Sequence, residues 1–394
     1  MSSENKEEFL KFPEGFLWGA ASASYQVEGG INNNDWAKAA RETGKVPPAD
    51  ISCDHYNKYE QDFDIAKSLG QNCQRISIEW SRIEPAEGRF DQNEIQHYRK
   101  VLQSLRDRGL KPFVTLWHFT LPTWFSDNGG FERKDAPEIF AKYCSFVTSQ
   151  LGDLCDNFST MNEPLVVSGI GYHRGKWPPF KKSKLKTIKV VKNLIKSHNL
   201  AYKEIKKENP RLEVGVVKHN INYVSNWNPI NKIISSVVDY FWNYYFLKKT
   251  LENTDAIGIN YYTSRFFGVK NDVPKNDMGW PLNPEGLEKV LIDLKKYNKP
   301  IYITEAGIAD EKDQYRADYI RGLVKSTYGA IQSGVDIRGF MYWSILDNFE
   351  WAEGFWPRFG LVEIDYDSPE KKRTIRQSAF VYKDICESNG LKIK

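Results

Sequence analysis

The chain has 394 residues, of which 41% are hydrophobic, 27% are charged and 14% are aromatic. This length is ample for a large core, and the aromatic content excludes a disordered, low-complexity chain. A net charge of +4 is near balance, which argues against nucleic-acid binding. No apolar run approaches the roughly 18 residues of a membrane span, and residues 1–8 lack the apolar core of a signal peptide. We therefore expect a soluble, cytoplasmic protein with no membrane partner.

Neither the lysine-rich run nor the cysteines of the sequence indicate a separate functional site. Six lysines lie between residues 181 and 192, and Leu185, Ile188, Val191 and Ile195 recur among them at helical spacing. We interpret this run as the start of an amphipathic helix with a solvated basic face, in preference to a polyanion site. The five cysteines are odd in number and show no C-x-x-C spacing, so neither a disulfide framework nor a structural metal is expected.

Short apolar runs alternate with longer amphipathic stretches along the chain. The runs are typical of buried parallel strands and span residues 16–20, 72–78, 111–117, 157–161, 213–217, 256–260, 300–304 and 337–343. Helical patterns span residues 93–108, 137–151, 187–208, 285–297 and 315–333. Eight strands interleaved with helices and no linker predict one α/β domain over residues 1–394, a (β/α)8 TIM barrel. Two Rossmann-like domains are the alternative, but no G-x-G-x-x-G turn is present.

The ends of the predicted strands carry polar, ionisable or aromatic residues almost without exception. In chain order they are Tyr25, Gln26, Arg75, Glu79, Trp80, Trp117, His118, Asn162, Glu163, His219, Asn220, Asn260, Tyr262, Glu305, Trp343, Glu350 and Trp351. In a barrel of this kind the active residues lie at the C-terminal ends of the strands. A barrel built only for stability does not need such residues there, so the sequence predicts a functional site at this face.

Two of these residues form a candidate acid and nucleophile pair. Glu163 and Glu305 follow strands 4 and 7, almost opposite each other across an eight-stranded ring. Two carboxyl groups that flank a glycosidic bond can divide the work if one is protonated and the other is ionised. The permanent charge of Arg75 at the same mouth favours the carboxylate form of Glu305. We therefore assign Glu163 as the acid/base and Glu305 as the nucleophile.

The neighbouring residues suit a sugar. Pyranoses present apolar C–H faces and hydroxyl groups, so their sites combine flat aromatic rings with hydrogen-bonding side chains. Such hydrogen bonds can come from four of the strand-end residues, namely Gln26, His118, Asn162 and Glu350. Trp343 and Trp351 can stack on the ring. Each residue taken alone also suits a purely structural role, and the prediction rests on their convergence at one face.

At this point five segments resemble motifs of glycoside hydrolase family 1, the β-glucosidase and β-galactosidase family, in the family's order. They are residues 12–29, 160–164, 303–307, 342–351 and 358–362, so the resemblance covers nearly the whole chain. It implies a retaining exo-β-glycosidase, most simply a β-glucosidase with possible galactosidase or fucosidase activity, that acts through a covalent glycosyl-enzyme intermediate. Retention implies two carboxyl groups about 5–5.5 Å apart. The resemblance implies a small carbohydrate substrate and no metal or organic cofactor.

The resemblance also implies roles for individual residues. Gln26, His118, Asn162, Glu350 and Trp351 are expected to hold the non-reducing sugar, with Trp343 as the platform beneath it. Arg75, Asn260 and Tyr262 are expected to hold the nucleophile in place. Trp280 matches an aglycone-side tryptophan, and Phe359 of the last motif joins the substrate-binding set. The pair Glu350 and Trp351 resembles the branch that acts on unphosphorylated sugars.

The chain departs from the family pattern in three places. Phe119 and Ala306 stand where Trp and Asn are usual, and residues 223–255 form an unusually short connection between strands 5 and 6. We hypothesise a thinner, more mobile wall there. Two other functions stay open at this point, a transglycosidase with the same intermediate and a catalytically silent sugar-binding relative. Silent relatives usually lose one of the two glutamates, and this chain keeps both.

Overall fold

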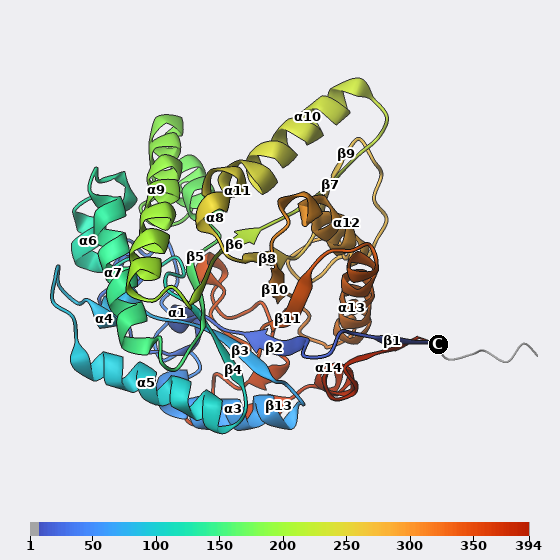
Figure 1. The fold of residues 1–394 in the computed structure, drawn as a ribbon, viewed down its shortest axis with the longest axis horizontal. Coiled ribbons are helices and arrows are strands. Elements are labelled where there is room, and N and C mark those ends of the chain that lie inside the picture. Colours follow the sequence, from blue (N-terminus) through green and yellow to red (C-terminus); the bar gives the residue numbers. More distant parts are fainter. Residues whose placement is uncertain (1–7, 394) are drawn as a thin grey trace, which may run out of the picture.

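A computed structural model describes residues 8–393, in which eight parallel strands close into a barrel (Figure 1). Around the ring the order is β10-β11-β2-β3-β4-β5-β6-β8. The bounds are β2 (Leu17–Ala21), β3 (Cys73–Ser77), β4 (Lys111–Thr115), β5 (Asn157–Asn162), β6 (Glu213–His219), β8 (Ile257–Tyr261), β10 (Ile301–Ala306) and β11 (Ile337–Trp343). Each strand lies within two residues of a predicted run at both ends, so the predicted TIM barrel is confirmed. The expectation for residues 1–8 falls almost entirely outside the described residues.

Helices surround the barrel and match the predicted helical patterns. They are α5 (Gln92–Asp107), α7 (Ala136–Leu151), α9 (Lys184–Glu208), α12 (Glu285–Leu294) and α13 (Arg316–Gln332). The pattern predicted over residues 285–297 is split, because its last turn is the 3-10 helix η5 (Lys295–Tyr297). Helix α5 begins where the side chain of Asp91 accepts hydrogen bonds from the backbone N–H groups of Asn93 and Glu94. Within residues 8–393, none of the helices combines the length and the hydropathy that a bilayer crossing demands.

Smaller elements complete the chain. Short or peripheral helices are α1 (Ser24–Val27), α2 (Asp35–Thr43), α3 (His55–Ser68), α4 (Trp80–Ile83), α6 (Thr123–Asp127), η1 (Gly130–Glu132), α8 (Pro164–Val167), η2 (Ser168–Arg174), η6 (Trp351–Glu353) and α14 (Gln377–Ser388). Outside the barrel, β1 (Glu8–Lys11) pairs with β14 (Gly390–Ile393), and β12 (Val362–Ile364) pairs with β13 (Arg373–Ile375). The five cysteines are buried and free.

The lysine-rich run begins helix α9, but its apolar stripe differs from the predicted one. Leu185 is 81% exposed and Ile188 is also exposed, whereas Val190 and Leu194 are buried. The buried stripe therefore starts about one turn later than the spacing predicted, because the first turn extends beyond the layer on which the helix packs. Lys186 pairs with Glu132 at 3.0 Å, and the basic face is solvated as expected.

The connection between β6 and β8 has two parts of different character. It comprises β7 (Asn222–Ser225), α10 (Pro229–Asp239), η3 (Tyr240–Tyr244), α11 (Tyr245–Thr250) and η4 (Leu251–Asn253), and β7 pairs with β9 (Ser264–Phe267). Phe246 and Leu247 of α11 are fully buried, so this part of the wall is well packed. Helix α10 instead stands away from the barrel (Figure 1). The hypothesis of a thinner, more mobile wall over residues 223–255 stays a prediction.

Candidate active site

Glu305 lies near the end of β10 with an ionic partner and a phenolic donor. The guanidinium of Arg75, from β3, contacts one carboxylate oxygen through Nη1. The hydroxyl of Tyr262 donates a hydrogen bond of 2.5 Å to the other oxygen. Arg75 is itself oriented by a 3.0 Å hydrogen bond from its Nε to Thr115 Oγ1. Both oxygens of this buried carboxyl group therefore accept hydrogen bonds, one of them from a permanent cation.

Glu163 directly follows β5 and has a different environment. Its φ of +42° turns the chain from the strand into α8. Burial raises the pKa of Glu163 to about 8, and the charge of Glu305 adds to the increase. The hydrogen bond from Asn260 and the charges of Arg75 and Lys218 lower it by less. Glu163 therefore keeps its proton at neutral pH, as a general acid must.

An amide network connects the two carboxyl groups. Asn162 Oδ1 accepts hydrogen bonds from Arg75 Nη2 at 2.8 Å and from Asn260 Nδ2 at 3.1 Å. Asn260 Nδ2 also donates to Glu163 Oε1 at 2.7 Å, and Thr304 Oγ1 donates to Asn260 Oδ1 at 2.7 Å. The family resemblance placed Asn260 beside the nucleophile. The structure instead places its side chain on Glu163, because Thr304 fixes the orientation of the amide.

Two buried side chains beside this network have unused hydrogen-bonding groups. Gln26 Nε2 donates to Asn348 Oδ1 and to the backbone carbonyl of Phe349, but its Oε1 has no partner among residues 8–393. His118 Nε2 lies 3.1 Å from Asn162 Nδ2, which can only donate. The His118 proton is therefore assigned to Nδ1, which likewise has no partner in the described chain. A buried acceptor and a buried donor without partners indicate a polar ligand.

Glu350 adds a third carboxyl group close to the other two. It follows β11 and immediately precedes Trp351. Burial raises the pKa of Glu350 to about 8, and the charges of Glu305 and Glu163 contribute to the increase. The free protein at neutral pH therefore holds Glu350 largely protonated, and this carboxyl group can donate as well as accept a hydrogen bond.

Aromatic rings form two groups at the mouth. The ring of His118 is nearly parallel to those of Trp343 and Trp351, with interplanar angles of 19° and 11°. A second group joins Tyr262, Trp280 and Phe359, with ring centroids 5.9 to 6.3 Å apart. The first group includes His118, whose Nδ1 has no partner within residues 8–393. The second contacts Glu305 through Tyr262, on the side where the resemblance places the aglycone.

Several strand-end residues lie outside this arrangement. Glu79 is buried, and its carboxylate accepts hydrogen bonds from Ser24, Ser81 and Thr120. Trp80 and Trp117 belong to the hydrophobic core. The remaining expected residues lie near the site. Tyr25 packs against Trp351, His219 meets Tyr262 edge-on at 5.9 Å, and both amide atoms of Asn220 are buried without a partner within the described part of the chain.

The sequence analysis missed residues that position the others. Thr115, Thr304 and Asn348 orient Arg75, Asn260 and Gln26, respectively. Thr304 and Asn348 stand inside motifs that the sequence analysis used, so their positions were a signal. Trp36, in the first turn of α2, and Trp177, in a loop, pack against Trp351 at 4.9 and 5.7 Å between ring centroids. Neither residue stands at the end of a predicted strand, so the sequence analysis gave no signal for them.

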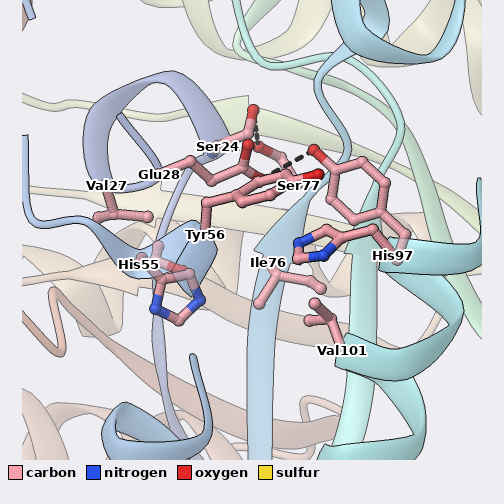
Figure 2. Close-up of a pocket in the computed structure, with 11 residues that line it drawn as sticks. Ser24, Val27, Glu28, His55, Tyr56, Ile76, Ser77, His97 and Val101 are labelled. Carbon is pink, nitrogen blue, oxygen red and sulfur yellow. Dashed lines mark hydrogen bonds between the residues drawn. The ribbon is translucent and has the colours of Figure 1, made fainter. Parts of the chain in front are cut away.

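A small cavity lies between α1 and β3, with residues of α3 and α5 also on its wall (Figure 2). Its volume of about 10 Å³ has room for roughly one water molecule. Glu28 at its wall accepts hydrogen bonds from Tyr98 at 2.8 Å and from Arg82 at 2.9 Å. Ser24 is held by its backbone N–H, which donates to Ser77 Oγ at 2.7 Å. These contacts fix the short helix that carries Gln26, and the cavity is too small for a sugar.

A (β/α)8 barrel whose strand ends bring together two buried carboxyl groups in unequal environments, unpartnered polar groups and aromatic rings has the features of a glycoside hydrolase. The model of glycosyl hydrolase family 1 matches residues 9–234 and 230–391. The chain belongs to this family.

Individual relatives agree with that membership. The chain is 33% identical to "Beta-glucosidase A" of Thermotoga maritima over 97% of this chain and 99% of the relative. It is 32% identical to a "Beta-galactosidase" of Pyrococcus woesei over 96% and 98%. The alignment with the Thermotoga enzyme has 442 positions against 394 residues in this chain, so this chain lacks residues that the relative has.

Solved structures show the same fold. A β-glycosidase from Pyrococcus horikoshii superposes with a TM-score of 0.91 at 37% identity, covering 98% of this chain and 97% of that one. A β-glucosidase from Thermotoga maritima in complex with glucoimidazole superposes with a TM-score of 0.92 at 32% identity, covering 97% and 100%. This chain is thus similar over its whole length to enzymes that act on β-linked sugars.

Proposed function

We propose that this protein hydrolyses unphosphorylated β-glycosides from the non-reducing end with retention, with β-glucosides preferred and galactosides or fucosides accepted. Glu305 is the nucleophile and Glu163 the acid/base. One observation carries the assignment, namely the unequal environments of the two carboxyl groups. Glu305 contacts Arg75 and Tyr262, whereas Glu163 is buried with a single amide donor and a pKa raised to about 8. The first state suits a nucleophile and the second an acid.

The first chemical step forms the glycosyl-enzyme. A carboxylate oxygen of Glu305 attacks the anomeric carbon while the bond from that carbon to the glycosidic oxygen breaks. Glu163 transfers its proton to the departing oxygen, and the aglycone leaves as an alcohol. Because Oε1 of Glu163 accepts from Asn260, the proton resides on Oε2 and is available to the leaving group.

The second step reverses the roles. Glu305 is now a neutral ester, so one of the charges that raised the pKa of Glu163 has gone. Glu163, ionised by the first step, accepts a proton from water, and the oxygen of that water attacks the anomeric carbon. The ester bond breaks, Glu305 recovers its charge, and the sugar leaves with its original β configuration. The interaction between the two carboxyl groups thus favours protonated Glu163 in the first step and ionised Glu163 in the second.

The glycone pocket is assigned to the hydrogen-bonding and aromatic residues beside the pair. Gln26, His118, Asn162 and Glu350 bind hydroxyl groups, and Trp343 and Trp351 contact the sugar face. A phosphorylated sugar is a poor fit for two reasons. Arg75 already uses its nitrogens on Thr115, Glu305 and Asn162, and position 350 carries a carboxyl group where a phosphate would need a cation.

Trp280 and Phe359 are assigned to the aglycone side. Both rings lie near Tyr262, whose hydroxyl touches Glu305, so they border the point at which the glycosidic bond breaks. Flat apolar surfaces of this kind favour aryl or alkyl groups and the C–H face of a second sugar. We also place the protein in the cytoplasm, since five buried, free cysteines fit a reducing compartment.

A panel of nitrophenyl β-glycosides between about pH 5 and 7 tests the substrate class. It contains the glucoside, galactoside, fucoside, mannoside and 6-phosphoglucoside. We expect release from the glucoside first. Release from the 6-phosphoglucoside alone would contradict the assignment of Glu350, and silence from a folded protein would favour a sugar-binding relative. Products formed at high acceptor concentration separate a hydrolase from a transglycosidase.

Trapping tests the roles of the two glutamates. A 2-deoxy-2-fluoro β-glucoside with a good leaving group forms the intermediate but hydrolyses slowly. We expect mass spectrometry of peptides to find the adduct on Glu305. An adduct on another residue, or turnover that survives Glu305→Gln, would contradict the nucleophile assignment.

A further inference from the structure

Helix α10 carries an apolar stripe that faces away from the barrel. The stripe consists of Ile230, Ile233, Ile234, Val237, Val238 and, just beyond the helix end, Phe241. Ile230 is 67% exposed, Ile233 is 64% exposed and Phe241 is 57% exposed. Two further exposed aromatic residues, Trp227 and Tyr240, lie beside the stripe in sequence. The helix itself projects from the body of the molecule, as Figure 1 shows.

The opposite face of α10 is polar and makes the contacts with the rest of the chain. Ser235 is the buried residue of the helix. Asn231 donates to Asn226 at 3.0 Å, and Asp239 accepts from Asn243 at 2.6 Å. A surface helix normally directs its apolar face to the core and its polar face to water. Helix α10 has the reverse arrangement, so its apolar stripe contributes nothing to the packing of its own barrel.

The spacing of the stripe is symmetric about its midpoint. The midpoint lies between Ser235 and Ser236. The three isoleucines at 234, 233 and 230 precede it by the same numbers of residues by which Val237, Val238 and Phe241 follow it. A second α10 that runs antiparallel to the first therefore presents the same side chains at matching positions. Self-complementarity of this kind is what a two-fold contact between identical chains requires. Apolar side chains three and four residues apart also form the ridges by which helices pack.

The size of the surface fits such a contact. The six stripe residues with Trp227 and Tyr240 expose on the order of 500 Å² of apolar surface. A stable interface buries about 800 Å² on each partner, of which slightly more than half is apolar. The stripe supplies about that apolar share, and exposed polar residues next to it, including Lys232 and Ser236, supply a rim.

The charge of the segment argues for protein and against lipid. Residues 227–241 contain one cation, Lys232, and one anion, Asp239, so their net charge is zero. A helix that lies on a membrane surface is typically rich in Lys and Arg on its polar face. A neutral segment has no attraction for anionic lipid headgroups and no repulsion between two copies. We propose that two copies of this chain associate through their α10 stripes, antiparallel about a two-fold axis.

Sedimentation of the full chain tests the association. We expect wild type to sediment at twice the chain mass of 45.7 kDa at micromolar concentrations. The double variant Ile233→Glu/Val237→Glu should sediment as a monomer with unchanged far-UV circular dichroism. Leu185→Glu, at an exposed apolar position on α9, is the matched control and should remain dimeric. A monomeric wild type, or a dimer that survives the double variant, would refute the proposal.

Cross-linking tests the geometry. The native cysteines are all buried, so Val237→Cys introduces an accessible thiol. A bis-maleimide that spans the roughly 8–10 Å between packed helices should convert this variant to a covalent dimer, and Leu185→Cys should stay monomeric. Equal cross-linking of both variants would contradict a contact through α10.

Two further measurements distinguish a dimer contact from a membrane contact and from an effect on catalysis. Flotation of a monomeric wild type with vesicles of phosphatidylglycerol and phosphatidylcholine would assign the stripe to a membrane and overturn the dimer. Aryl-glucosidase activity of the Ile233→Glu/Val237→Glu variant should match wild type, because neither side chain touches the carboxyl pair. The association and the proposed hydrolysis can therefore fail independently.

Discussion

Asn260 donates a 2.7 Å hydrogen bond to the carboxyl group of Glu163 from two strands away in the barrel. The donor is locked, since Thr304 occupies the oxygen of the same amide. A hydrogen bond to a carboxyl oxygen favours the ionised form and opposes the effect of burial. Burial and the charge of Glu305 raise the pKa of Glu163, and the amide of Asn260 is the first of the groups that lower it.

Removing that amide should shift the pH profile. Asn260→Ala deletes a contact that lowers the pKa of Glu163, so the pKa rises above about 8. Activity requires protonated Glu163, and the basic limb of kcat/KM should move up by about half to one pH unit. The measurement is a pH–rate profile on an alkyl glucoside. Thr115→Val, which affects Arg75 but not this amide, is the control, and a limb that moves down would contradict the assignment.

Glu163→Gln should show a strong dependence on the leaving group. The variant cannot protonate the departing oxygen, so hydrolysis of an alkyl glucoside should fall by about 10²–10⁴-fold. A dinitrophenyl glucoside needs no proton, and its first step should lose far less. Burst kinetics with the two substrates separate the steps. The basic limb near pH 8 should also disappear, and equal losses for both leaving groups would contradict the acid role.

Glu350 should make the stability of the free enzyme dependent on pH. Its pKa is raised in the folded state from 4.5 to about 8, so folding favours the protonated form. The stability it contributes is fully present below about pH 4.5 and is lost as pH rises through about 8. Glu350→Gln is neutral at every pH. Its melting temperature should therefore match wild type near pH 4.5 and exceed it by about 2–4 °C near pH 8.5. The pKa of Glu163 is raised as well, so the stability of the variant should still depend partly on pH. A difference in melting temperature between variant and wild type that is largest at acidic pH would contradict the argument.

Gly307 should be intolerant of any side chain. A Cβ atom there would lie 1.8 Å from the backbone carbonyl oxygen of Trp343, which cannot rotate away. Gly307→Ala should lower the free energy of unfolding by about 2–4 kcal/mol and reduce activity, because β10 and β11 must separate next to Glu305. Denaturant titration measures the first effect. Gly169→Ala is the control, since its Cβ would meet only Trp242 at 3.8 Å, and equal losses in both variants would contradict the steric reason.

The strands and the carboxyl pair were predictable because each depends on a local pattern. An apolar run followed by a polar residue marks a barrel strand and its end, and this identified Glu163 directly after β5 and Glu305 near the end of β10. The direction of an amide is not local. Asn260 contacts Glu163 because Thr304, on another strand, fixes its orientation, and no spacing along the chain contains that information.

The direction in which the apolar face of a helix points was also not predictable from the sequence. Helical spacing identifies a stripe but not what the stripe faces. Leu185 was expected among the buried residues of α9 and is instead the most exposed part of its first turn. The stripe of α10 likewise faces outward, which depends on where the polar residues Asn231 and Asp239 find their partners.

One chain of hydrogen bonds beside the carboxyl pair runs in a single direction and ends at His118. Arg75 donates to Asn162, and Asn162 donates to His118, which leaves Nδ1–H as the terminal donor. A group bound there has to accept a hydrogen bond, whatever else it does. A hydroxyl or an ether oxygen can do so, whereas a protonated amine has only donors. The enzyme should therefore discriminate against an amino sugar whose ammonium group occupies this position. The reason is the direction of the hydrogen bonds, which starts at the guanidinium of Arg75 and leaves only a donor at His118.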